Sequence, residues 1–155
     1  MDAKVTWKGK LAFEAVADSG KSIMLDSASD PAERLGPGPM ELVAMSLAGC
    51  TAMDVISILE KKKQAVTNFE VKVHADWAED YPKVYTRAEI EYQVTGRAID
   101  ESALVRAIKL SIQKYCPVHA MLSQAFPVSQ CYVIFEDEGN GARHVVAEGN
   151  YVVEE

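Results

Sequence analysis

The stretch that decides the fold is PMELVAMSLAGCTAMDVISIL, at residues 39–59. Apolar side chains occur on every face of a helix drawn through it, and its only charges are Glu41 and Asp54. A helix that is apolar all round is buried all round. Pro39 suits the first helical position, and the lysines at 61–63 suit the end of the helix dipole. We predict a long central helix that a chain of 155 residues covers only with help from a second subunit.

Short strands are predicted on both sides of this helix. Apolar and polar residues alternate over residues 4–8 and again over 11–15, with turns at Gly9 and at Ser19-Gly20, and residues 23–25 form a short apolar run. After the helix, residues 71–77 and 88–94 alternate on either side of a turn at 79–82. One dry face and one wet face in each segment predict an antiparallel hairpin.

The last third of the chain predicts two helices and further strands. Asp100 can cap a helix that runs to Cys116, where Pro117 disfavours the helical conformation of the preceding residue. A short third helix is expected at 119–125. Strands are expected at 131–135, at 145–146 and at 151–153. The predicted fold class is α+β, a single domain over residues 1–155 with antiparallel β-sheets wrapped around the long buried helix.

Composition narrows the class of protein. A hydrophobic fraction of 48% and a charged fraction of 25% exclude disorder and coiled coil. A net charge of −7 without a local basic patch argues against nucleic acid and anionic membrane as partners. No uninterrupted run of about 18 uncharged apolar residues is present, and the N-terminus lacks an apolar signal core. We therefore expect a cytoplasmic protein.

The three cysteines are the main candidates for chemistry. Taken singly, Cys50 fits a small buried hydrophobe, Cys131 fits a strand core, and Cys116 can be exposed at an irregular helix end. Two of them can form a catalytic pair in a reducing compartment. No CxxC occurs, and Pro117 interrupts the helix that would join Cys116 to His119 in a zinc site. We predict no metal and no cofactor, and we expect His119 to be a hydrogen-bonded polar residue.

Two motifs carry a resemblance to a known family. The segment Gly36–Cys50 and the later sequence Lys114-Tyr115-Cys116-Pro117-Val118, whose cysteines are 66 residues apart, resemble the OsmC/Ohr family. The names stand for osmotically inducible protein C and organic hydroperoxide resistance protein. The resemblance extends over almost the whole chain. It is greatest to the branch with Met-Glu-Leu at the helix start and Cys-Thr-Ala-x-Asp-Val-x-Ser-Ile-Leu further on.

The resemblance implies a fold, an assembly and an activity. Family members are intertwined homodimers with active sites at the subunit interface, and they reduce organic and, more weakly, inorganic hydroperoxides through two cysteines. Carried over, Cys50 is the peroxidatic thiol and Cys116 the resolving thiol. The cycle passes through a Cys50 sulfenic acid and a Cys50–Cys116 disulfide, which a lipoyl-type dithiol reduces. No metal, flavin or haem is required.

The chain departs from the family pattern at the groups that activate the thiol. The family uses an arginine from the N-terminal strands, held by a glutamate at the start of the long helix. Here the first arginine is Arg34, and Met40 stands at the usual glutamate position, with Glu41 one residue later. Nine residues of helix rise about 14 Å and place Glu41 on the face opposite Cys50. Glu41 can therefore act only from another subunit or through an irregular helix start, and Arg34 is the candidate cation.

Two other possibilities stay open at this point. Asp54 lies beside Cys50 on the helix, where it raises a thiol pKa unless it is paired, or where it holds an incoming Arg or Lys.

A ligand-binding or redox-sensing dimer of the same fold is the alternative function. Its pocket would be lined by methionines, namely Met40, Met45, Met53 and Met121.

Overall fold

The computed structural model describes residues 1–151. They fall into two compact units, Met1–Val43 and the residues from Ala44 onward, which are described separately. The order of elements is three strands, a long helix, two strands, a helical stretch and two strands, with a one-turn helix before the long one. This matches the predicted order.

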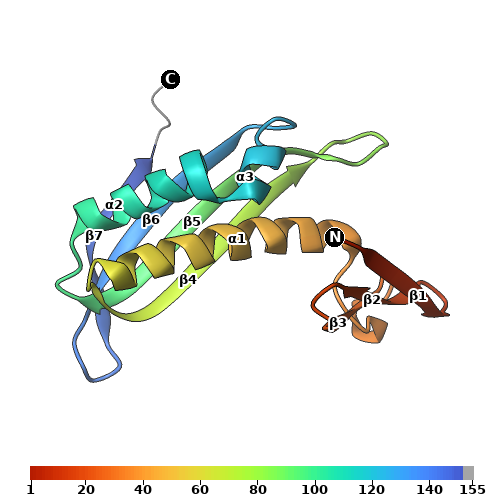
Figure 1. Ribbon diagram of the computed structural model, residues 1–155, viewed down its shortest axis with the longest axis horizontal. Helices are drawn as coiled ribbons and strands as arrows, with labels where there is room; N and C mark the ends of the chain where they lie inside the picture. Colours follow the sequence, from red (N-terminus) through yellow and green to blue (C-terminus); the bar gives the residue numbers. More distant parts are fainter. Residues whose placement is uncertain (152–155) are drawn as a thin grey trace. The chain divides into compact units, whose positions relative to one another are not determined.

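The first unit contains a three-stranded antiparallel sheet and a loop. Its strands are β1 (Ala3–Gly9), β2 (Ala12–Ala17) and β3 (Ser22–Leu25), in the order β1-β2-β3 (Figure 1). The loop that follows includes the one-turn helix η1 (Pro31–Glu33). Val5 and Trp7 of β1 are exposed, and the main core cluster takes its buried residues from the second unit.

The second unit is built on a four-stranded sheet in the order β4-β5-β6-β7 (Figure 1). The strands are β4 (Ala65–Trp77), β5 (Tyr85–Arg97), β6 (Val128–Asp137) and β7 (Arg143–Tyr151). The β4–β5 pair is the predicted antiparallel hairpin, but β5 and β6 are parallel. The prediction of wholly antiparallel sheets is therefore wrong at this pair. Its strands are joined by a helical crossover, the connection that parallel strands need.

The long helix α1 (Pro39–Lys61) packs on this sheet beside α2 (Glu101–Leu110) (Figure 1). Its fully buried residues form one stripe with a spacing of four: Leu47, Thr51, Val55 and Leu59. Burial on every face is therefore wrong for one chain, since Met45 and Met53 are 57% and 73% exposed. By length and composition α1 could cross a membrane, as many core helices could, and its buried stripe places it in the core.

The helical crossover changes form just before the second predicted motif. Asp100 caps α2 as predicted, accepting a hydrogen bond from the backbone N–H of Ser102 at 2.9 Å. The next turn, Ser111–Tyr115, is a π-helix, closed by the Cys116 N–H donating to the Ser111 carbonyl at 2.8 Å. Cys116 is extended, and α3 (Pro117–Leu122) begins at the proline. Single π turns occur often at functional sites.

In the final hairpin, one residue predicted to lie in the core, Cys131, lies outside it. β6 buries Gln130, Tyr132 and Ile134, so Cys131 is on the other face and is half-buried. The prediction that Cys131 belongs to the core is wrong because both faces of this strand are rich in apolar residues, so alternation does not choose between them. The two weak strands predicted near the C-terminus are one strand, β7, and Val152 and Val153 lie outside the described residues.

Candidate active site

Three side chains meet where α1 passes the end of the π-helical turn. One sulfur each from Cys50 and Cys116 and a carboxylate oxygen of Asp54 all lie within 4.8 Å of one another. Cys50 and Asp54 are four residues apart on α1, the spacing that puts two side chains on the same helix face. The structure thus brings together the two cysteines that the family resemblance singled out, within one chain, and it adds a carboxylate.

Cys116 is the more deeply buried of the two thiols. Its exposed fraction is 2%, and this burial, together with a hydrogen bond to the Cys50 sulfur, raises the pKa of Cys116 to about 12. The N–H of His119 donates to the Cys116 sulfur at 3.3 Å and acts in the opposite direction. Cys116 is therefore a protonated thiol at neutral pH, beside the Cys50 sulfur.

A series of buried hydroxyl groups ends at Asp54. The Tyr92 hydroxyl lies 2.6 Å from the Thr51 Oγ1, and Thr51 lies 2.9 Å from the Ser111 Oγ. The Ser111 hydroxyl in turn donates to the Asp54 Oδ2 at 2.9 Å. All three hydroxyl residues are fully buried.

The direction of these hydrogen bonds follows from the single proton of each hydroxyl. Ser111 gives its proton to Asp54, so Thr51 must donate to Ser111, and Tyr92 must donate to Thr51. Burial raises the pKa of Tyr92, which keeps it a donor. The sequence pattern does not reveal this series, although Thr51 follows Cys50 directly and Ser111 begins the turn that ends at Cys116.

His119 contributes a backbone donor rather than a base. Burial lowers the pKa of its imidazole, and the carbonyl of Ile112 counteracts this only in part, so the ring is neutral at pH 7. The Nε2 lies 3.3 Å from the Gln130 Nε2, whereas the Nδ1 has no hydrogen-bonding partner of normal geometry among residues 1–151. The expectation of a hydrogen-bonded histidine thus holds for one ring nitrogen only.

The other two predicted site residues, Arg34 and Glu41, form a pair in the first unit. The Arg34 Nη1 lies 4.0 Å from the Glu41 Oε2, and the Arg34 Nε donates to the Ala28 carbonyl at 2.9 Å. The same Glu41 oxygen accepts the Gly38 N–H at 2.6 Å. Glu41 thus binds the backbone at the start of α1 and also faces the guanidinium.

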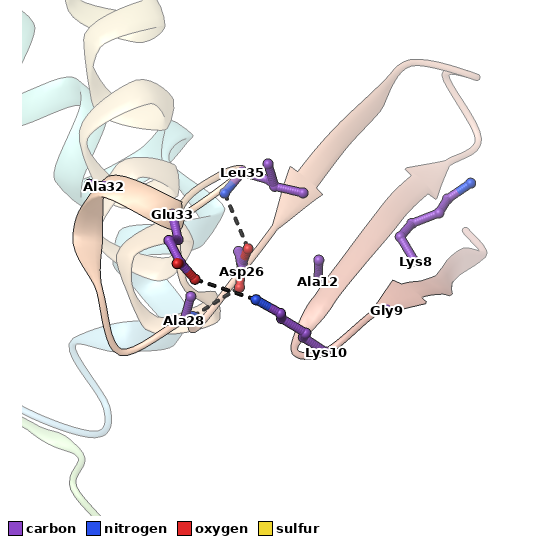
Figure 2. Close-up of a pocket in the computed structure, with 9 residues that line it drawn as sticks. All are labelled: Lys8, Gly9, Lys10, Ala12, Asp26, Ala28, Ala32, Glu33 and Leu35. Atoms are coloured by element: carbon purple, nitrogen blue, oxygen red, sulfur yellow. Dashed lines mark hydrogen bonds and ion pairs between the residues drawn. The ribbon is translucent and has the colours of Figure 1, made fainter.

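Asp26 organises the loop that carries Arg34. Its carboxylate accepts the N–H groups of Ala28 at 2.9 Å and Leu35 at 3.2 Å (Figure 2). The Leu35 N–H is the main reason that the pKa of Asp26 is lowered. An adjoining hollow of 580 Å³ is bordered by Lys10, which pairs with Glu33 at 3.4 Å. Aspartate at the start of a Ser/Pro/Gly loop is the sequence signal for such turns.

Comparison with known proteins assigns the class. The family model described as OsmC-like protein matches residues 30–130, and the chain belongs to this family. Protein YhfA of Escherichia coli K12 is a relative, 38% identical over 134 residues, which are 86% of this chain and 98% of YhfA.

Solved structures agree with the family assignment. A hypothetical protein from Aquifex aeolicus VF5 has a TM-score of 0.78 and 28% identity, with 88% of this chain and 97% of that chain covered. The organic hydroperoxide resistance protein OhrB of Bacillus subtilis has a TM-score of 0.56 and 18% identity, with coverages of 84% and 96%. The predicted OsmC/Ohr-like fold, with two sheets and a long central helix, is confirmed.

Proposed function

We propose that the protein is a thiol-dependent peroxidase that reduces organic hydroperoxides and, more weakly, inorganic ones. Cys50 is the peroxidatic thiol and Cys116 the resolving thiol. The observation that carries the proposal is the pair of sulfurs within 4.8 Å of each other, with Cys116 buried and protonated. Support also comes from the family, which includes the hydroperoxide resistance protein OhrB of Bacillus subtilis.

The first step consumes the peroxide. The Cys50 thiolate attacks one peroxide oxygen, so an S–O bond forms while the O–O bond breaks. The alkoxide that leaves takes a proton and becomes an alcohol, and Cys50 becomes a sulfenic acid. The protonated Cys116 thiol lies within 4.8 Å of the Cys50 sulfur, so its S–H group is close enough to donate to a thiolate there after a small side-chain rotation.

The second step regenerates the site. The Cys116 sulfur attacks the Cys50 sulfur, and the hydroxyl of the sulfenic acid leaves as water with the Cys116 proton. The disulfide requires the sulfurs to approach to about 2.05 Å. A lipoyl-type dithiol then supplies two electrons and two protons by thiol–disulfide exchange.

Asp54 is the group placed to move the protons. Its carboxylate lies near both sulfurs and is held by the Ser111 hydroxyl. It accepts the Cys50 proton and returns it to the departing alkoxide, which is general acid–base catalysis by one residue. Arg34, aligned by Glu41, is the proposed source of positive charge at Cys50, from the same chain or from a second copy.

A homodimer in the cytoplasm is the proposed assembly and location. OsmC/Ohr proteins are typically dimers. The face of α1 that carries Met45 and Met53 is exposed in one chain, and apolar side chains of this size favour cover by a partner.

Peptide mapping by mass spectrometry tests the proposal. Reduced protein is treated with one equivalent of cumene hydroperoxide, and the disulfides are identified in the wild type and in Cys131→Ser. The proposal predicts a Cys50–Cys116 disulfide in both proteins and its reduction by dihydrolipoamide over repeated cycles. If both thiols stay free, the peroxidase proposal is wrong. One oxidation without repeated turnover would favour the redox-sensing alternative.

A further inference from the structure

We propose that Cys50, Asp54 and Cys116 form a binding site for one thiophilic divalent cation, of which Zn²⁺ is the biological example. The inference rests on the geometry of this cluster and is independent of whether the protein reduces peroxides. The sequence argued against a zinc site that used His119, but the structure supplies Asp54 as the third ligand instead.

The spacing of the three ligand atoms suits a tetrahedral ion. Zn–S bonds of about 2.3 Å and Zn–O bonds of about 2.0–2.2 Å place tetrahedral ligand atoms roughly 3.5–3.8 Å apart. The three atoms already lie within 4.8 Å of one another, so side-chain shifts of an ångström or so close the site. Three protein ligands leave a fourth position for water or an external thiol.

Two of the three ligands are already oriented by neighbours. The Asp54 Oδ2 accepts the Ser111 hydroxyl at 2.9 Å, and Ser111 is fixed by the buried Thr51. The Cys116 sulfur accepts the His119 N–H at 3.3 Å. Hydrogen bonds of this kind orient metal ligands and increase affinity, typically by about 10- to 100-fold.

The charge of the cluster favours a cation. Asp54 brings a carboxylate to the two thiols, which bind a metal as thiolates. A divalent ion offsets two of the three negative charges that the fully ionised ligands carry. Sulfur ligands select Zn²⁺ and similar ions over Mg²⁺ and Ca²⁺, which prefer all-oxygen sites.

Metal binding and disulfide formation exclude each other because both use the same two sulfurs. Binding of M²⁺ to the two thiols releases two protons, whereas oxidation of the pair to a disulfide removes two ligands and releases the ion. The bound ion therefore shields the thiols from oxidants.

Cobalt titration of the reduced, full-length protein tests the site. In a Cys131→Ser background we expect one Co²⁺ per chain, with a thiolate-to-cobalt charge-transfer band and tetrahedral d–d bands that Zn²⁺ abolishes. Cys50→Ser and Cys116→Ser should each lose the tetrahedral dithiolate spectrum. Asp54→Asn should weaken binding at least about tenfold, and Ser111→Ala by a smaller factor. Protein oxidised with diamide should bind no Co²⁺.

The inference is overturned if the reduced protein gives no thiolate-to-cobalt band, or if Asp54→Asn binds as tightly as its parent. Far-UV circular dichroism checks that each variant is folded. A measurement on the wild type does not depend on variants: one equivalent of Zn²⁺ should protect Cys50 and Cys116, and not Cys131, from iodoacetamide. Peroxide turnover without Co²⁺ binding would refute only the metal site, and Co²⁺ binding without turnover would refute only the peroxidase.

Discussion

Cys116 and Cys131 are two thiols with similar electrostatics and different neighbours. Burial raises the pKa of both, and carboxylates add to the effect: Asp54 at Cys116, and Glu89 and Glu91 at Cys131. Cys131, however, borders a surface groove of 410 Å³ on the sheet. Cys116 is enclosed, beside a second sulfur and a backbone N–H donor.

The comparison shows that burial and a nearby anion do not identify a reactive thiol in this fold. The distinguishing features of Cys116 are the nearby sulfur of Cys50 and the hydrogen-bonded Asp54, to which the proposed mechanism assigns the disulfide and the proton transfer. If this explanation is correct, substitutions around Cys116 should affect chemistry, and matched substitutions around Cys131 should not.

The largest effect is expected for Cys50→Ser. Loss of the nucleophile should lower the rate of cumene hydroperoxide reduction by about 10³-fold or more, because a serine hydroxyl does not ionise at neutral pH. Dihydrolipoamide consumption measures the rate. A variant that retains even a tenth of the wild-type rate would show that the pair is not the reacting centre.

Asp54→Asn should follow, with a loss of about 10²-fold in the single-turnover rate of Cys50 oxidation. The amide keeps the shape of the side chain and accepts the Ser111 hydrogen bond, but it cannot take a proton. Stopped-flow measurements across pH should show that the loss shrinks as hydroxide replaces the base. Glu89→Gln is the matched control at Cys131 and should leave the rate unchanged.

A smaller effect is expected on stability at alkaline pH. The folded protein raises the pKa of Cys116 from 9.0 to about 12, so between these values the unfolded chain has lost a proton that the folded chain keeps. Stability from this group is therefore complete below pH 9 and falls as pH rises towards 12, by at most about 1.4 kcal/mol per pH unit. Urea unfolding at several pH values measures the slope, which should be shallower in Cys116→Ser. An equal slope in both proteins would contradict the assignment.

The smallest effect is expected for Cys131→Ser. The side chain is half-buried and lies outside the reacting cluster, so the free energy of unfolding should change by no more than about 0.5 kcal/mol. Peroxide turnover should equal that of the wild type. A large loss of turnover would mean that the third thiol takes part in the cycle.

Much of the fold could be predicted from local patterns, because the spacing of apolar residues along the chain indicates which face of each helix or strand is buried. The long helix, the hairpin and the Asp100 cap all follow from residues close together in the sequence. The parallel β5–β6 pair could not be predicted in this way, since it depends on how a helical crossover returns to the sheet. The all-apolar pattern of α1 indicates burial but does not say whether the same chain or another supplies the cover.

The two thiols of the candidate site could be predicted from the sequence, but the buried hydroxyl groups around them could not. Cys50 and Cys116 are marked by their flanking motifs, whereas Thr51, Tyr92 and Ser111 are ordinary core positions until the fold aligns their hydroxyls. The π-helical turn that aims Ser111 at Asp54 has no signature in the helical pattern that precedes it.

The buried hydroxyl groups donate in one direction, from Tyr92 in the sheet towards Asp54 beside the two sulfurs. A change in the hydrogen bonding of Asp54 therefore affects Tyr92. If Asp54 is protonated and becomes the donor, Ser111 and Thr51 must reverse, and the Tyr92 proton is then left without its acceptor inside the core. A reversal of the Asp54–Ser111 hydrogen bond would thus change the hydrogen bonding of Tyr92, which lies outside the cluster of Cys50, Asp54 and Cys116. Ultraviolet difference spectra of Tyr92 should therefore follow each catalytic cycle from within the protein.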